Sequence, residues 1–315
     1  MKKVPEGIWS GRIDHHTNRS SFRIHQIIEL VEVEDSKSVN KACALIGFES
    51  EEGVRRNKGQ LGAAAAPNEL RKELAKLPWM FSDDKRLVDI GTVECIGSEL
   101  EQAQKNLGNV VSKVLTNNGT PIILGGGHET AFGHYSGVRK FIGSDASLGI
   151  INIDAHFDLR SYEEQTSSGT MFRQILDTDS NSNYLVLGIQ RYGNTKELFD
   201  KADELRVEYV YEDQMTTGNT ESVLNNFIDK HDFIMLTLCT DVLNAAFAPG
   251  VSAPSPFGLD PKVVRAIIQT VASNKKTLSF DISEVNPILD ENNRTVKLGA
   301  YLVNEAITSF LGGNK

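Results

Sequence analysis

The chain has 315 residues, of which 40% are hydrophobic and 24% charged, so it is long enough to bury a large core. Its formal net charge is −9, and this acidity argues against a surface that binds nucleic acid or an anionic membrane. Three widely separated cysteines, Cys43, Cys95 and Cys239, favour a reducing compartment over a disulfide-stabilised scaffold.

Targeting signals are not evident in the sequence. Residues 1–16 lack the apolar segment of a secretory signal peptide. No apolar run approaches the roughly 18 residues that a membrane helix needs. We therefore expect a cytoplasmic protein without a membrane or nucleic-acid partner.

Short apolar runs, taken in chain order, predict eight β-strands. They cover residues 42–49, 86–93, 121–127, 148–154, 184–190, 207–211, 233–238 and 277–283. Several runs are almost continuously hydrophobic, as expected of strands that are buried on both faces. Amphipathic segments between the runs predict helices, including 67–77, 98–115 and 261–272. This alternation predicts an α/β fold with a mostly parallel sheet and helices on both sides.

The chain shows no internal repeat, low-complexity tract or linker-like stretch. We therefore expect residues 1–315 to form a single domain. In sheets of this kind ligands bind outside the carboxyl ends of the strands, so the residues just after each predicted strand are the first to inspect.

Three predicted strand ends carry residue types that bind metals. These residues are His128 after the third run, Asp154, His156 and Asp158 after the fourth, and Cys239 and Asp241 after the seventh. Each alone is more typical of a turn, a helix cap or a small buried hydrophobe. Alternate residues of an extended segment point to one side, so the three residues after the fourth run can converge. Together the six groups indicate cations, because carboxylates gathered without them would repel one another and take up protons.

The donor set also indicates which metal ions to expect. Carboxylates with two imidazoles suit Mn²⁺ or similar ions, whereas the thiol of Cys239 would favour Zn²⁺. Six ligands are enough for a bridged pair about 3.5–4 Å apart, which lowers the pKa of a bridging water and supplies hydroxide at neutral pH. The eighth run adds Asp281 and Glu284 at the same edge of the predicted sheet.

Four segments of the chain resemble the signature segments of the ureohydrolases, the family of arginase and agmatinase. They read GGGHE, DAHFD, CTDVLNAAFAPG and SFDISEVNP, and the likeness extends from about residue 44 to the C-terminus. The resemblance implies a three-layer α/β fold with an eight-stranded parallel sheet, a Mn²⁺ pair and a homo-oligomer. It also implies that His128, Asp154, His156, Asp158 and Asp241 are ligands, with Asp154 bridging. The sixth ligand of the family is usually an Asp, and here Cys239 stands in its place.

Two departures from arginase indicate which members the chain resembles most. Arg160 stands where arginase has an Asn, and Phe172 stands where it has a His. The GTMF form around Phe172 resembles agmatinase and also the members that hydrolyse N-formimidoyl-L-glutamate to L-glutamate and formamide in histidine degradation. The segments DAHFDLR, VRRNKG and TLCTDVLNAAFAPGVSAPSP together resemble these latter members most. An agmatinase or guanidino-acid hydrolase, or a non-catalytic metal-binding relative, remains as an alternative.

The expected reaction assigns roles to individual side chains. Hydroxide held by the metals would attack the amidine carbon, while Glu284 pairs with the amidine nitrogens and Asp158 orients the hydroxide and carries a proton to the leaving amine. Arg160 would bind one substrate carboxylate, and Arg191 with Arg55 or Arg56 would bind the second. The simpler alternatives are that Arg160 pairs with Glu163 or Glu164, that Glu284 is a solvated loop carboxylate, and that Cys239 is an inert buried thiol.

Overall fold

The computed structural model describes residues 1–32, 38–215 and 217–312. A nine-stranded sheet runs through the described residues in the order β1-β3-β2-β4-β9-β8-β5-β6-β7, and each pair of neighbouring strands is parallel. The strands are β1 Glu29–Leu30, β2 Ala42–Glu49, β3 Arg86–Glu94, β4 Thr120–Leu124, β5 Leu148–Ile153, β6 Ser182–Ile189, β7 Glu208–Tyr211, β8 Phe233–Cys239 and β9 Thr277–Ser283.

All eight predicted strands are confirmed, and the parallel α/β fold with them. The sequence did not predict β1, which pairs with β3 at one edge of the sheet. Both residues of β1 are exposed, and a two-residue strand shows neither a hydrophobic run nor an alternating pattern. The sheet therefore has one strand more than the eight predicted.

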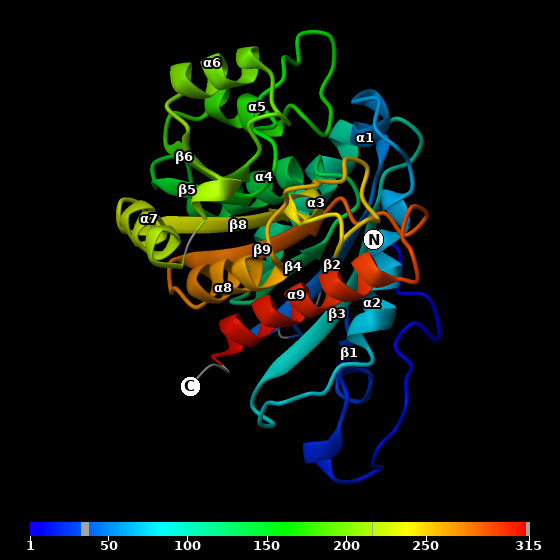
Figure 1. Cartoon of the computed structure of the whole chain (residues 1–315). Coiled ribbons are helices and arrows are strands. Elements are labelled where there is room, and N and C mark those ends of the chain that lie inside the picture. Colours follow the sequence, from blue (N-terminus) through cyan, green and yellow to red (C-terminus); the bar gives the residue numbers. More distant parts are fainter. Residues whose placement is uncertain (33–37, 216, 313–315) are drawn as a thin grey trace.

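The α-helices alternate with the strands along most of the chain (Figure 1). They are α1 Glu52–Arg56, α2 Ala66–Leu74, α3 Leu100–Thr116, α4 Thr130–Ile142, α5 Met171–Thr178, α6 Lys196–Glu204, α7 Thr217–Asp229, α8 Pro261–Ala272 and α9 Arg294–Leu311. The segments predicted as helices appear as α2, α3 and α8. The start of α8 is typical, because Pro261 occupies the first turn and the Asp260 side chain accepts a hydrogen bond from the backbone N–H of Lys262 at 2.7 Å.

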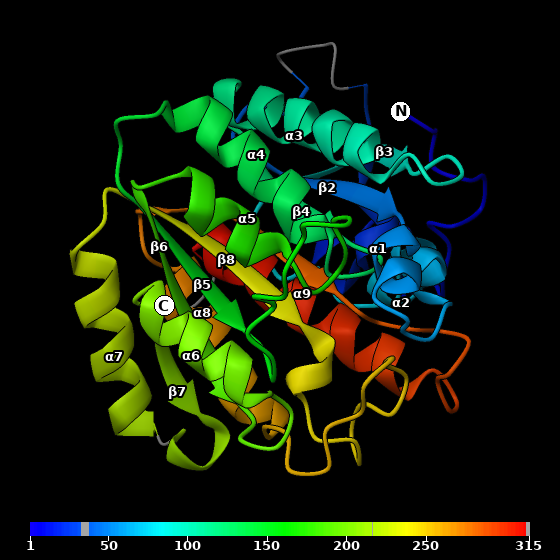
Figure 2. The ribbon, with the colours of Figure 1, turned by 90° about the horizontal axis from the view of Figure 1, so that it is seen from above.

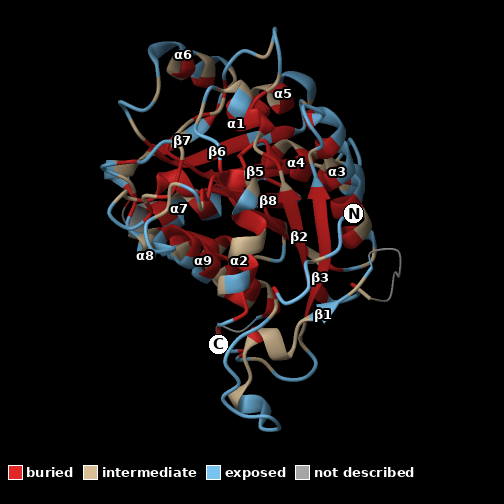
Figure 3. Ribbon diagram, turned by 90° about the vertical axis from the view of Figure 1, so that its right-hand side faces the viewer, coloured by how far each residue is buried: buried red, intermediate tan, exposed pale blue. Residues whose placement is uncertain are grey.

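Two hydrophobic cores lie on opposite faces of the sheet. One contains side chains of α2, α7, α8 and α9, and the other contains side chains of α3, α4, α5 and α6. Figure 2 shows α3 and α4 side by side on one face, with α8 and α9 on the other. Apart from the edge strands β1 and β7, the strands between them are almost wholly buried, whereas much of the N-terminal segment before β2 is exposed (Figure 3). This three-layer arrangement explains why the strand sequences are almost continuously apolar.

The order of the central strands positions the candidate site. The chain runs from β4 to β5, and β9 and β8 later fill the gap between these two strands. Parallel strands end at the same edge, so the loops after β4, β9, β8 and β5 meet there, at the switch point where such sheets bind ligands. Within the described residues, no helix is both long enough and apolar enough to cross a membrane.

Candidate metal centre and active site

A cavity of about 130 Å³ opens at the carboxyl edge of the central strands. Its lining combines most of the predicted ligands with small polar and apolar residues, and it is drawn from the carboxyl ends of β2, β4, β5, β6, β8 and β9 and the segments that follow them. The lining residues are Val54, Asn57, Gly59, His128, His156, Asp158, Arg160, Ser168, Gly193, Leu198, Cys239, Asp241, Ser252, Ala253 and Glu284. Residues far apart in the sequence therefore meet in one place, as the rule for strand ends predicts.

His128 follows β4 through a turn of three glycines. At Gly126 an added Cβ would clash with the backbone oxygen of Ser50, so this turn requires glycine. The ring Nε2 of His128 lies 3.1 Å from the Thr237 hydroxyl, which in turn donates to Asp281 at 2.9 Å. Thr237 therefore accepts a hydrogen bond from the Nε2–H group of His128, and the lone pair of the ring is left on Nδ1.

The Nδ1 atom of His128 faces two carboxylates. It lies 2.9 Å from Asp158 Oδ2 and 3.1 Å from Asp154 Oδ2. Asp154 is wholly buried directly after β5, where the Asn152 side chain donates to Oδ2 at 3.0 Å and the backbone N–H of His156 donates to Oδ1 at 2.9 Å. These bonds hold the Asp154 carboxylate in one orientation before any ion binds.

The segment after β5 is not extended throughout. Asp158 adopts a left-handed backbone conformation with φ of 50°, which bends the chain and brings its carboxylate against His128. The ring Nδ1 of His156 instead lies 3.2 Å from Asp241 Oδ2. Simple alternation along a strand therefore does not describe this segment, although Asp154, His156 and Asp158 do converge on one cavity.

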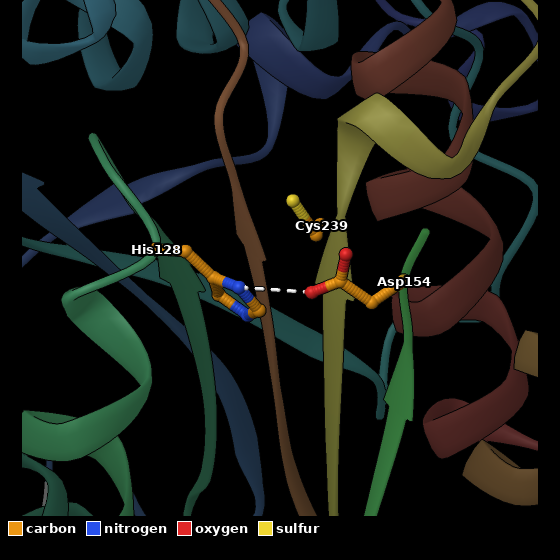
Figure 4. Close-up of side chains that lie close together, drawn as sticks. All are labelled: His128, Asp154 and Cys239. Carbon is orange, nitrogen blue, oxygen red and sulfur yellow. Dashed lines mark ion pairs between the residues drawn. The ribbon is translucent and has the colours of Figure 1, made fainter. Parts of the chain in front are cut away.

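Two groups of side chains are each compact enough to hold an ion. In one group His128, Asp154 and Cys239 have ligand atoms within 4.8 Å of one another, and in the other Asp154, His156 and Asp241 do. Figure 4 shows the first group, which approaches from the ends of three strands. Asp154 belongs to both groups, which is the position that a bridging ligand requires.

The electrostatics of the two groups fit cations. One oxygen of Asp241, Oδ1, is buried and has no hydrogen-bond partner in the described part of the chain. Burial lowers the pKa of His128, but the carboxylates of Asp154 and Asp158 outweigh it and raise that pKa well above its usual value. Burial and the neighbouring carboxylates raise the pKa of the Cys239 thiol, so a thiolate there depends on nearby cations. The side chains present thus fit a pair of divalent ions.

Glu284 lies at the same edge, just beyond β9. Its φ of 66° places it in the left-handed region, a strained conformation for this residue type that often occurs at functional sites. Its Oε1 accepts a hydrogen bond from the backbone N–H of His128 at 2.8 Å. Without cations, burial together with Glu129 and Asp241 raises the pKa of Glu284 to about 8. Glu284 is therefore a buried carboxylate that lines the cavity and not a solvated loop residue.

Phe172 lies beside the metal centre. Its ring contacts the His128 ring edge-on, with centroids 5.6 Å apart, and stacks on Tyr184 with centroids 4.2 Å apart. Phe172 therefore presents an apolar surface at the position where the resemblance to arginase implies a histidine.

The four predicted substrate arginines do not lie together. Arg160 lines the cavity and forms no ion pair within the described residues, so it is not neutralised by Glu163 or Glu164. The Arg55 guanidinium forms two hydrogen bonds of 2.6 Å with Glu52.

Arg56 and Arg191 also have other partners. Arg56 binds Glu52 and Glu101, and the Arg191 guanidinium stacks on the Tyr211 ring at 3.6 Å. Neither residue lines the cavity, and neither does Arg55. This arrangement supports Arg160 as a substrate contact and does not support the other three, because neighbouring acids or an aromatic ring already bind their charges.

Several cavity residues were not predicted from the sequence. Asn57, Ser168 and Ser252 add polar groups to the lining. Single Asn and Ser residues such as these are too common in turns to stand out in a sequence. The geometry of the folded chain was needed to select them.

Comparison with known proteins identifies the family. A sequence model of the arginase family matches residues 41–308, so the chain belongs to the arginase family. The formimidoylglutamase of Lysinibacillus sphaericus is 58% identical over 310 residues, which cover 97% of this chain and 96% of that protein. The formimidoylglutamase of Geobacillus sp. strain WCH70 is 52% identical over 306 residues, with coverage of 96% and 94%.

Solved structures support the same fold. The crystal structure of formimidoylglutamase from Bacillus subtilis aligns with a TM-score of 0.83 at 23% identity and covers 95% of this chain and 94% of that one. Trypanosoma cruzi formiminoglutamase, solved with Mn²⁺, aligns with a TM-score of 0.79 at 22% identity, with coverage of 87% and 95%. The arginase fold predicted from the sequence is confirmed.

Proposed function

We propose that this chain is a metal-dependent hydrolase that converts N-formimidoyl-L-glutamate and water to L-glutamate and formamide. The observation that carries the proposal is one cavity with two ligand groups that share Asp154, beside Arg160, which has no ion-pair partner among the described residues. The names of the relatives that match almost the whole chain support this substrate.

We further infer two Mn²⁺ per chain. His128, Asp154, Asp158 and Cys239 would hold one ion, and Asp154, His156 and Asp241 the other. The Mn²⁺ in the Trypanosoma cruzi relative supports the identity of the metal. When bound, such a pair lowers the pKa of a water between the ions and supplies a nucleophile near neutral pH.

The residues around the ions have separate tasks. Glu284 uses Oε1 to accept the His128 backbone N–H, which leaves Oε2 to accept an N–H of the formimidoyl group. Asp158 would orient the attacking water and accept its proton at a carboxylate oxygen. As the new C–O bond forms and the C–N bond to glutamate breaks, Asp158 returns that proton to the leaving amine nitrogen.

Arg160 favours a substrate that carries a carboxylate. A guanidinium with no acidic partner in the described residues binds a carboxylate through two parallel hydrogen bonds. Such a group favours formimidoyl-glutamate, and it repels the cationic far end of agmatine. A guanidino-acid hydrolase is the second candidate, because that substrate also carries a carboxylate. The other five family ligands are all present, and together with Glu284 they argue against a non-catalytic relative.

A substrate panel on the purified protein with Mn²⁺ tests the assignment. We expect formimidoyl-glutamate to be hydrolysed with a higher kcat/KM than agmatine, arginine or guanidinobutyrate. Faster turnover of agmatine would refute the assignment. Metal analysis is expected to find close to two Mn²⁺ per chain, and a chelator is expected to abolish activity. Full activity of a metal-free preparation would contradict the metal-dependent mechanism.

Three further expectations belong to the proposal. A single domain over residues 1–315 is supported by the one sheet that runs through the described residues. A cytoplasmic location and a homo-oligomer remain predictions from the composition and the family resemblance. Size-exclusion chromatography with light scattering tests the oligomer.

A further inference from the structure

Asn194 lies in the loop after β6 and binds the backbone on both sides of His156. Its Oδ1 accepts a hydrogen bond from the N–H of Phe157 at 3.0 Å, and its Nδ2 donates to the carbonyl oxygen of Ala155 at 2.9 Å. Ala155 and Phe157 are the two neighbours of His156 in the sequence. A single carboxamide therefore holds the short segment that carries a candidate metal ligand.

The position of Asn194 explains why a side chain is needed there. The pairing of β5 with β6 ends near the cavity, where the N–H of Asp154 donates to the Leu187 carbonyl and the N–H of Gln190 donates to the Ala155 carbonyl. Beyond Ala155 the chain leaves the sheet. A carboxamide carries a donor and an acceptor, as a peptide group does. The Asn194 side chain therefore accepts the hydrogen bond of the buried Phe157 N–H in place of a neighbouring strand.

The same side chain also holds the turn that forms one wall of the cavity. Nδ2 of Asn194 makes a second bond, 2.9 Å long, to the Gln190 carbonyl, and the N–H of Gly193 closes the turn onto that carbonyl at 3.1 Å. An added Cβ at Gly193 would lie 3.5 Å from Nε2 of His156. The His156 ring is thus bounded by Gly193 on its Nε2 side, while its Nδ1 faces Asp241.

We propose that Asn194 is a positioning residue for His156. It acts through the backbone of Ala155 and Phe157 and through the turn at Gly193, and it keeps Nδ1 of His156 directed at the ion shared with Asp154 and Asp241. The inference rests on the proposed function, since it concerns the same metal pair. We expect the cation site that contains His156 to depend most on Asn194, because both anchored residues are direct neighbours of His156.

Calorimetric titration of metal-free protein with Mn²⁺ tests this role without substrate. In the wild type we expect two binding steps. Asn194→Ala is expected to weaken one step by about 10–100-fold, the range typical of residues that orient a metal ligand, and to change the other step much less. Asn194→Ser keeps a hydroxyl that can accept the Phe157 N–H, so its loss of affinity is expected to be smaller.

Asn181→Ala is the matched control. Asn181 donates its Nδ2 to the Ser144 carbonyl at 2.9 Å, just before β6 and at the opposite edge of the sheet. We expect this variant to keep both Mn²⁺ steps. Thermal unfolding of the metal-free proteins separates the two possible roles, because a purely structural asparagine would lower the melting temperature and leave both Mn²⁺ affinities intact.

The outcomes are distinct. Two unchanged Mn²⁺ steps in a folded Asn194 variant would overturn the inference while leaving the proposed function in place. A wild type that binds no Mn²⁺ would overturn both. If Asn194→Ala does not fold, Asn194→Ser provides the comparison, and its selective loss of one step would support the role.

Discussion

The floor of the cavity and its mouth are built differently. At the floor, His128 and Asp154 are almost wholly buried, and they are hydrogen-bonded to side chains of the central strands β8 and β5. At the mouth, Arg160 is exposed, and its backbone N–H donates a hydrogen bond to the Gly169 carbonyl at 2.9 Å. The floor is thus organised before a ligand arrives, whereas the charge at the mouth has no ion-pair partner in the described part of the chain. This difference separates the residues for the metals from those that select the substrate.

The largest effect is expected at the floor. Asp154→Ala removes the carboxylate that both ligand groups share, so we expect both Mn²⁺ steps to be lost. Activity should fall by roughly three orders of magnitude or more, which corresponds to about 4 kcal/mol of lost transition-state stabilisation. Metal analysis and hydrolysis of formimidoyl-glutamate measure the two effects.

Asp145→Ala is the control for this change. Asp145 is an exposed carboxylate just before β5, at the opposite edge of the sheet. It should keep wild-type metal content and activity. An Asp154→Ala protein that still holds two Mn²⁺ would show that Asp154 does not bridge.

A substitution at the mouth is expected to change substrate binding and not metal binding. Arg160→Ala removes a charge-assisted hydrogen-bonded contact, which typically costs about 1.5–3 kcal/mol, so KM for formimidoyl-glutamate should rise by roughly 10–100-fold. Metal content is expected to stay at the wild-type value. Arg55→Ala is the matched control, because Glu52 binds that guanidinium outside the cavity. Equal effects of the two substitutions on KM would remove the distinction between the arginines.

Cys239 tests whether the floor tolerates another ligand. Cys239→Asp supplies the carboxylate that the family usually has there, and we expect Mn²⁺ binding to be preserved or tightened by up to about tenfold, because carboxylates suit Mn²⁺ better than thiolates do. Oxidants are expected to inactivate the wild type by converting a thiolate to a sulfenic acid, and to spare Cys239→Asp. Cys95→Ser, which changes a thiol that does not line the cavity, should remain as sensitive as the wild type. Loss of metal in Cys239→Asp would assign the cysteine another role.

The smallest effect is expected from substituting Gly169, which lies against the Arg160 side chain. A Cβ at Gly169 would lie 2.9 Å from Cδ of Arg160 and 3.1 Å from Oδ1 of Asn57, so Gly169→Ala should displace the arginine slightly. We expect KM to rise only a few-fold, with unchanged Mn²⁺ binding. The double variant Gly169→Ala/Arg160→Ala should have the KM of Arg160→Ala, because the effects of substitutions at contacting residues do not add. Full additivity would show that Gly169 acts elsewhere.

The sequence by itself determined the parallel α/β fold, the eight long strands and the strand ends at which Asp154 and Glu284 stand. These features follow from local patterns, since buried strands are continuously apolar and parallel strands end at one edge. The short edge strand β1 has no such pattern and was missed.

Only the tertiary structure decided which side chains meet. It bends the chain at Asp158 and pairs the Arg55 guanidinium with the Glu52 carboxylate. It also leaves Arg160 without an ion-pair partner among the described residues, and it brings Asn194 against the segment that carries His156. No local pattern could predict these contacts, because each joins side chains or backbone groups whose separation depends on how loops pack after the sheet has formed. An arginine has the same charge wherever it stands, and its function depends on the partner that the fold places beside it.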